Sequence, residues 1–217
     1  MPQSSSPPTS AQASPARRST WTPGSTSPLA EPLPQPLRPA VFLDRDGTLI
    51  EDRNYLSRPD DVALLPGAAD AVGWLNRAGV PVIVVTNQSG IGRGYFGERE
   101  YEAVADRIDA LFREAGARLD ACYFCPHAPD SSPACNCRKP RPGLFLRAAR
   151  EHSIELGNSY FIGDRLRDVL PGVPLGGSGF LIGSAAVAEN LEIPASITRV
   201  DSVREAAERV LAALGFD

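Results

Sequence analysis

The chain has 217 residues, 42% hydrophobic content and a formal net charge of −4. It contains no run of about twenty apolar residues that would span a bilayer, and it has no long basic run of the kind that binds nucleic acid. Its length suits one sizeable core and little beyond it. We therefore expect a monomeric protein whose partner is a small-molecule substrate, without nucleic acid or membrane.

Residues 1–39 are rich in Pro, Ser and Thr and have almost no periodic apolar pattern. Such a segment buries too little apolar surface to offset the entropy lost on ordering, so we predict a disordered N-terminal extension. A docking arm or an organellar transit peptide stays an alternative, because the segment is Ser-rich and acid-poor. Without the apolar segment that a secretory signal needs, we expect a cytoplasmic location, where thiols stay reduced.

Apolar patterning from residue 40 onward predicts an α/β fold, because short apolar runs alternate with longer amphipathic ones. Strands are expected at 40–44, 80–87, 119–125, 159–164 and 179–183, and helices at 68–79, 98–116, 142–152 and 201–214, with a loop before the last helix. Continuously apolar strands are typical of a parallel sheet buried on both faces. We predict a Rossmann-like three-layer domain over 40–217, with the boundaries of the last strand left open by the Gly- and Pro-rich run at 170–182.

The motif D-x-D-G-T follows the first predicted strand, at residues 44–48. Two acids separated by one residue can take different roles in one reaction. Asp44 can attack a phosphoryl group, and Asp46 can move the proton that the leaving oxygen needs. Gly47 permits a tight turn at this strand end. Asp and Gly are also frequent in ordinary polar turns, so the motif alone leaves its function open.

Polar side chains also follow two later strands, at Thr86 and Asp164. Parallel strands bring their carboxyl ends to one edge of a sheet, where ligands bind. Thr86 can donate a hydroxyl group and Lys139 can supply positive charge to a phosphoryl group in transfer. Asp44 and Asp164 offer the hard oxygen ligands that Mg²⁺ prefers. These residues predict a magnesium-dependent site for phosphoryl transfer.

Four segments carry a resemblance to a known family: DRDGTLIEDRNYL, VTNQSGIGRGYF, CPHAPDSSPACNCRKP and GDRLRD. In this order they resemble the haloacid dehalogenase superfamily of aspartate-nucleophile phosphatases, over roughly residues 40–185. Within it they are similar to the heptose-1,7-bisphosphate 7-phosphatases, to which histidinol phosphatases are related. The resemblance implies a haloacid dehalogenase-type fold without a large cap domain.

The resemblance also implies roles at individual positions. Asp44 would be the nucleophile, Asp46 the acid and base, and Thr86 and Lys139 the stabilisers of the phosphoryl group. Mg²⁺ would be held by Asp44, the backbone carbonyl of Asp46, and Asp164. Substrate contacts are implied at Asp52, Arg53, Asn54, Tyr55, Asn87, Gln88, Ser89, Arg138 and Arg165.

The cysteine-rich segment carries a second predicted metal site. Four ligands suited to a tetrahedral zinc are present, at Cys125, His127, Cys135 and Cys137. A zinc ion whose four positions are all filled by protein is structural. Arg138 and Lys139 follow directly, so we expect zinc to orient these cations. Disulfides, buried thiols and a four-cysteine site that includes Cys122 stay open as alternatives.

Together these features and the resemblance imply an enzyme that removes the 7-phosphate of D-glycero-D-manno-heptose 1,7-bisphosphate through an aspartyl-phosphate intermediate. Arg53 and Arg138 favour a bisphosphate, because the second anionic end of the sugar needs a cation. Histidinol phosphate is the alternative substrate. The alternative of another class is a non-catalytic, zinc-stabilised interaction module, but a scaffold would not need two acids that repel each other.

Overall fold

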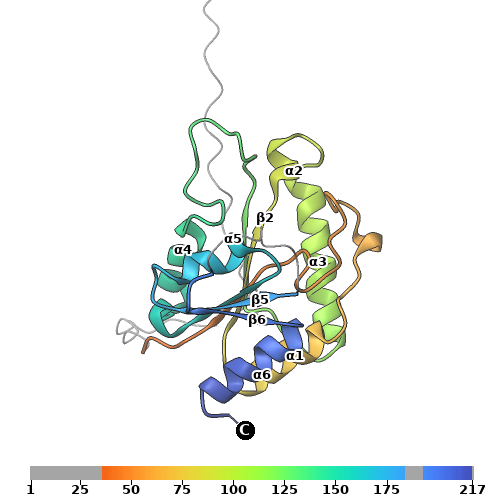
Figure 1. Ribbon diagram of the computed structural model, residues 1–217. Coiled ribbons are helices and arrows are strands. Elements are labelled where there is room, and N and C mark those ends of the chain that lie inside the picture. The colour runs from red at the N-terminus through yellow and green to blue at the C-terminus, as the bar shows by residue number, and fades with distance from the viewer. Residues whose placement is uncertain (1–35, 184–192, 217) are drawn as a thin grey trace, which may run out of the picture.

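The computed structural model describes residues 36–183 and 193–216 (Figure 1). Most of the predicted extension over 1–39 therefore lies outside the described residues. Within the described ranges one sheet has the strand order β3-β2-β1-β4-β5-β6, and every neighbouring pair is parallel. The strands are β1 (Val41–Leu43), β2 (Val82–Asn87), β3 (Ala121–Cys125), β4 (Tyr160–Gly163), β5 (Ser178–Ile182) and β6 (Ile197–Val200). The predicted parallel sheet is confirmed.

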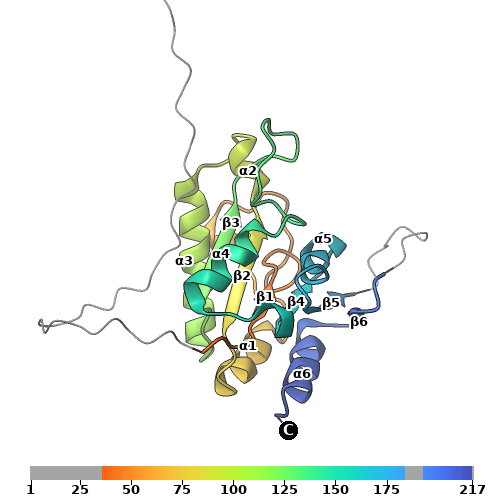
Figure 2. The same cartoon turned by 90° about the vertical axis from the view of Figure 1, so that its left-hand side faces the viewer.

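Helices cover both faces of the sheet. They are α1 (Ala68–Arg77), α2 (Ser89–Gly92), α3 (Glu98–Glu114), α4 (Gly143–His152), α5 (Leu166–Val169) and α6 (Val203–Ala213). Alternation along β1 sends Val41 and Leu43 into a core with α1, α3 and α6, whereas Phe42 packs with α4 on the other face. Figures 1 and 2 both show α1 and α6 side by side. This arrangement confirms the predicted three layers.

The prediction of a loop before the last helix was wrong, because Ile197–Val200 forms β6 and pairs with β5. Only Ile197 and Val200 of this strand are buried. Thr198 and Arg199 are exposed at the edge of the sheet, so the strand lacks the continuous apolar run that marks the central strands. The four-residue helices α2 and α5 were also missed, since four residues are too few to show a helical period.

Close packing against Phe161 explains the Gly-rich run before β5. Phe161 is fully buried in β4. A Cβ atom at Gly172 or Gly177 would lie 2.5 or 2.6 Å from its ring. Glycine is therefore needed where the chain crosses this ring, and β5 then begins at Ser178, one residue before the expected start.

The connection from β1 to α1 contains turns, isolated bridges and the 3₁₀ helix η1 (Pro59–Asp61). Two further 3₁₀ helices, η2 (Leu156–Asn158) and η3 (Leu170–Gly172), flank β4. No inserted cap domain lies between β1 and α1, as the resemblance implied. Across the two described ranges, none of the helices combines the length and the apolar content needed to cross a bilayer.

Candidate active site

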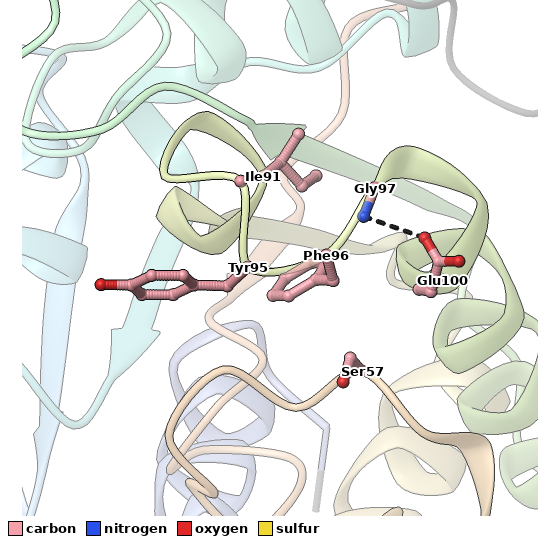
Figure 3. A pocket seen from close by; sticks show the side chains of 7 residues that line it. Ser57, Ile91, Tyr95, Phe96, Gly97 and Glu100 are labelled. Carbon is pink, nitrogen blue, oxygen red and sulfur yellow. Dashed lines mark hydrogen bonds between the residues drawn. The ribbon is translucent and has the colours of Figure 1, made fainter.

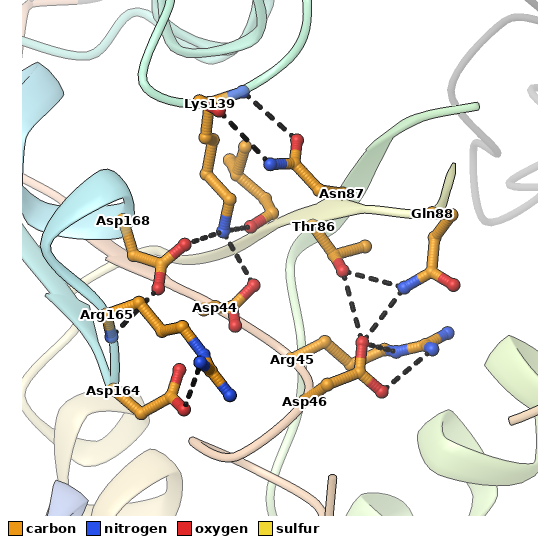
Figure 4. Close-up of polar contacts among 11 residues, drawn as sticks. Asp44, Arg45, Asp46, Thr86, Asn87, Gln88, Lys139, Asp164, Arg165 and Asp168 are labelled. Carbon is orange, nitrogen blue, oxygen red and sulfur yellow. Dashed lines mark hydrogen bonds and ion pairs between the residues drawn. The ribbon is translucent and has the colours of Figure 1, made fainter. Parts of the chain in front are cut away.

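The predicted catalytic side chains meet at the carboxyl ends of the central strands (Figure 4). Lys139 reaches this point from the loop between β3 and α4. Its Nζ lies 2.6 Å from Asp44 Oδ1 and 2.8 Å from Asp168 Oδ1, and it donates to the Val85 carbonyl at 2.6 Å. The Lys139 side chain is 1% exposed. A buried ammonium thus links the residue after β1 to α5 (Leu166–Val169).

Burial and crowded negative charge shape the electrostatics of this cluster. Burial, then the charge of Asp168, raises the pKa of Asp44 to about 7, against the opposing effect of Lys139. Burial also raises the pKa of Asp164, and Asp168 adds to the shift. For Lys139 burial disfavours the charged form, but Asp44 and Asp168 outweigh it and raise its pKa. The three acids together exceed the charge of one lysine, so the cluster favours a bound cation.

Three carboxylates of this cluster can hold a metal ion. Asp44, Asp164 and Asp168 each place one oxygen within 4.8 Å of the others. The turn after β1 lies close against them, because a Cβ atom at Gly47 would be 2.6 Å from Asp164 Oδ2 and the φ angle of Gly47 is +80°. The backbone at the D-x-D turn and three hard oxygens fit Mg²⁺. Asp168 was not in the predicted ligand set.

Asp46 points away from Lys139, toward a second group of side chains (Figure 4). Its Oδ2 accepts hydrogen bonds from Gln88 Nε2 at 2.9 Å and from the Thr86 hydroxyl at 3.4 Å. Arg45 donates to both carboxylate oxygens of Asp46. No role was predicted for Arg45, although it stands between the two motif acids in the sequence. Asp44 and Asp46 therefore occupy different polar surroundings within one turn.

The predicted substrate contacts after β1 divide into two groups. Asp52 lies 3.4 Å from Arg165 Nη2, and the Nε of Arg165 lies 3.4 Å from Asp164 Oδ2, so this pair reaches the acidic cluster. Arg53 instead pairs with Glu51 at 2.8 Å on the exposed surface. Asn54 is also exposed. Of these residues, Asp52 and Arg165 have described contacts that lead to the catalytic carboxylates.

The remaining predicted contacts lie on β2, α2 and the cysteine loop. Asn87 binds the backbone of Lys139 twice, accepting from its N–H at 3.0 Å and donating to its carbonyl at 3.2 Å. Ser89 begins α2. Arg138 donates to the His127 carbonyl at 3.2 Å. Asn87 thus connects the end of β2 to the loop that carries Lys139, whereas Arg138 joins two parts of that loop.

Four side chains converge in the cysteine loop as the zinc prediction required. Cys125, His127, Cys135 and Cys137 each place a ligand atom within 4.8 Å of the others, and all four cysteines of the chain are free. The Sγ atoms of Cys125 and Cys137 are 3.1 Å apart, and His127 Nδ1 lies 3.2 Å from Cys137 Sγ. The cluster does not include Cys122, whose Sγ lies 3.4 Å from the Tyr101 hydroxyl. The four-cysteine alternative is not supported.

A surface pocket of about 560 Å³ lies between the loop after β1 and the α2–α3 connection (Figure 3). Ser57 lines one side, and Tyr95, Phe96 and Glu100 line the other. The Tyr95 ring also packs edge-on against Tyr55, with 4.6 Å between the ring centroids. None of the catalytic carboxylates lines this pocket, so it is separate from the carboxylate cluster.

Comparisons with known proteins show which family this chain is similar to. A family model described as haloacid dehalogenase-like hydrolase matches residues 51–176. A relative named D-glycero-beta-D-manno-heptose-1,7-bisphosphate 7-phosphatase, from Photorhabdus laumondii, is 43% identical over 136 residues, covering 60% of this chain and 72% of the relative. A relative with the same name from Helicobacter pylori is 42% identical over 135 residues, covering 62% and 77%.

Two solved structures extend the similarity to the fold. The D,D-heptose 1,7-bisphosphate phosphatase from B. bronchiseptica, complexed with magnesium and phosphate, has a TM-score of 0.74 at 31% identity and covers 81% of this chain and 99% of its own. The corresponding phosphatase from Burkholderia thailandensis has a TM-score of 0.62 at 30% identity with the same coverage. The fold similarity thus spans most of the chain.

Proposed function

Because the chain belongs to the haloacid dehalogenase-like hydrolases, we propose that it is a magnesium-dependent phosphatase that removes the 7-phosphate of D-glycero-D-manno-heptose 1,7-bisphosphate. The observation that carries this proposal is the contact between Lys139 and Asp44, at 2.6 Å, beside Asp164 at the edge of the sheet. The heptose substrate is supported by the names of relatives that are more than 40% identical.

In the first step an Asp44 oxygen attacks phosphorus, and the bond from phosphorus to the sugar oxygen breaks. Asp46 gives its proton to the departing oxygen, which leaves as the sugar hydroxyl. Lys139 and the Thr86 hydroxyl stabilise negative charge on the phosphoryl oxygens, and the fixed position of Lys139 makes that stabilisation preorganised. The product on the protein is an aspartyl phosphate at Asp44.

In the second step Asp46, now ionised, removes a proton from water as the water oxygen attacks phosphorus. The bond from phosphorus to Asp44 breaks, inorganic phosphate leaves, and both acids return to their starting forms. One carboxyl group thus serves as acid and then as base, which requires that it reach both oxygens in turn.

The proposed Mg²⁺ ligands are Asp44, the backbone carbonyl of Asp46, and Asp164, with Asp168 adjoining them. When bound, the ion neutralises charge on the phosphoryl oxygens as a Lewis acid. Zinc is proposed for the cysteine loop, where all four ligands come from protein and the role is structural. Reduced thiols at that site suit the expected cytoplasmic location, and a monomer stays the expected state.

Substrate contacts are proposed at the rim around these acids. Asp52 and Arg165 have described links to Asp164, and Arg138 adjoins Lys139. Arg138 is the favoured cation for the 1-phosphate, because Arg53 is paired with Glu51 in the described structure. Histidinol phosphate stays the alternative substrate, since the same aspartyl-phosphate chemistry would hydrolyse it.

The test is a panel of kcat/KM values in Mg²⁺ for both anomers of the heptose bisphosphate and for histidinol phosphate. We expect the β-anomer, for which the relatives are named, to exceed histidinol phosphate at least a hundredfold, a difference of about 2.7 kcal/mol in transition-state binding. A preference for histidinol phosphate would replace the substrate. Retained activity in Asp44→Asn would overturn the mechanism, and no hydrolysis of any ester would support the non-catalytic module.

A further inference from the structure

Arg45 is a buried cation in the middle of the D-x-D motif, and the mechanism above gives it no part. Its residue exposure is 2%. The side chain forms a bidentate pair with Asp46, with Nε 3.0 Å from Oδ2 and Nη2 2.9 Å from Oδ1 (Figure 4). Parallel bonds from a guanidinium fork fix the plane of a carboxylate as well as its distance.

The remaining surroundings of Arg45 leave Asp46 as its main polar partner. The Tyr101 ring of α3 lies under the guanidinium, with 5.6 Å from Cζ to the ring centroid. The Nη1 atom is buried and has no hydrogen-bond partner among the described residues. Burial disfavours the charged form of Arg45, but the charge and hydrogen bonds of Asp46 outweigh it and raise the arginine pKa. Asp46 therefore fixes the position of the buried Arg45 guanidinium. Arg45 in turn helps to fix the position of the Asp46 carboxylate.

Gln88 completes the arrangement from the other side of Asp46. Its Nε2 donates to Asp46 Oδ2 at 2.9 Å and lies 2.8 Å from the Thr86 hydroxyl. The Asp46 side chain keeps 21% exposure. Its carboxylate is therefore held in one orientation by Arg45 after β1, Thr86 on β2 and Gln88 just before α2, while one part of it stays open toward solvent.

We propose that Arg45 is the positioning residue of Asp46, which aligns this carboxyl group for proton transfer to the leaving oxygen. This inference rests on the proposed function, because the proton transfer by Asp46 belongs to the proposed mechanism. It assigns no contact between Arg45 and the substrate. Without the fork, Asp46 would keep only the hydrogen bonds from Gln88 and Thr86 to one of its oxygens, and it would spend less time in line with the leaving oxygen. The loss would fall on esters whose leaving group needs a proton.

The test compares two substrates in Arg45→Met: heptose 1,7-bisphosphate, with an alkoxide leaving group, and p-nitrophenyl phosphate, whose phenolate leaves without a proton. The parameter is kcat/KM, which covers events up to the first irreversible step and so leaves out hydrolysis of the aspartyl phosphate. We expect a loss of about 10- to 100-fold for the heptose ester and less than about threefold for the aryl ester, because misalignment removes only part of the roughly 10²- to 10⁴-fold that a general acid contributes. KM for the heptose ester should change less than twofold.

Two comparisons separate positioning from a structural role. Combining Arg45→Met with Asp46→Asn should be no worse for the heptose ester than Asp46→Asn alone, because the fork then has no acid to align. Arg204→Met is the matched control, since Arg204 also lies over a ring, 4.6 Å from Trp74, and near a carboxylate, 3.5 Å from Glu208, but on α6. It should leave both substrates unchanged.

Equal losses for the two esters in a variant with an unchanged melting temperature would overturn the inference. If Arg45→Met does not fold, Arg45→Lys gives the same comparison, because lysine keeps the charge without the fork. We expect a smaller loss, again confined to the heptose ester, and an equal loss for both would also overturn it. A wild-type protein that hydrolyses neither ester would overturn the proposed function instead.

Discussion

Lys139 is the only lysine among the 217 residues, while arginine supplies the other 21 cationic side chains. An ammonium group has three N–H donors, and three acceptors surround this one: Asp44 Oδ1, Asp168 Oδ1 and the Val85 carbonyl. A guanidinium is planar and longer, so it cannot direct donors to three such positions in a space that is 1% exposed. The positions of these three acceptors therefore favour lysine over arginine at position 139.

Lys139→Arg should abolish most activity although it keeps the positive charge. Losing one preorganised donor to a phosphoryl oxygen lowers kcat by about 10²- to 10³-fold, and overpacking should cost about 1–3 kcal/mol of stability. The measurement is kcat with heptose bisphosphate, together with urea unfolding. Arg204→Lys on α6 is the control and should affect neither. Near wild-type activity in Lys139→Arg would show that charge alone suffices at this position.

At the scale of the element, the loop between β3 and α4 carries the four side chains that are proposed to bind zinc. Its ends are anchored by Cys125 at the end of β3 and by Asn87, which binds the backbone of Lys139. The intervening run APDSSPA offers almost no apolar side chains for a core. The converging ligands are therefore the main candidate for holding Arg138 and Lys139 in place.

Cys135→Ser should lower bound zinc, the melting temperature and kcat/KM together, because one thiolate ligand is lost and the loop loses its cross-link. Zinc is measured by elemental analysis of the purified protein and stability by thermal unfolding. Cys122→Ser is the matched control, since this thiol lies outside the cluster and should leave the zinc content unchanged. Full zinc content in Cys135→Ser would assign the metal to other ligands.

At the scale of the whole molecule, the sheet order brings β2, β1 and β4 side by side. Asp44, Thr86 and Asp164 lie far apart in sequence, yet each stands at the carboxyl end of one of these strands. The proposed site residues all lie between Asp44 and Asp168, inside the domain predicted over 40–217. Metal binding should accordingly stabilise the entire fold, since it cross-links neighbouring strands.

Mg²⁺ affinity should rise about tenfold between pH 6 and pH 8. The pKa of Asp44 is raised from 3.8 to about 7, first by burial and then by Asp168, so a proton competes with the metal below pH 7. By linkage, the contribution of Asp44 to the stability of metal-free protein is fully present at low pH and is lost as pH rises through about 7. Mg²⁺ should offset that loss, so its effect on the melting temperature should be largest at high pH.

Calorimetric titration at pH 6, 7 and 8, in buffers with different heats of ionisation, measures both the affinity and the proton released. In Asp44→Asn the pH dependence should be much weaker, because this carboxyl group no longer titrates. A dissociation constant that stays constant across this range in the wild-type protein would contradict the assignment of Asp44 as a ligand with a raised pKa.

The sequence by itself determined the central strands and the longer helices, because their apolar periods are long enough to read. Motif spacing also placed Asp44, Thr86 and Asp164 at strand ends, and it identified the four side chains of the cysteine loop that the structure brings together. It did not reveal β6, because an edge strand buries only two of its four residues. Short elements and edge strands contain too few regularly spaced apolar residues to be recognised from the local sequence.

Only the tertiary structure decided which charged side chains contact one another. Asp168 forms an ion pair with Lys139. Arg45 donates to Asp46 and lies over the ring of Tyr101, which belongs to α3 and follows Arg45 by more than fifty residues. Such contacts depend on strand order and on the direction of each side chain, which arise from packing between distant segments. The sequence determines which side chains are present in the site. Their orientations and pKa values depend on neighbouring residues that only the folded sheet brings together.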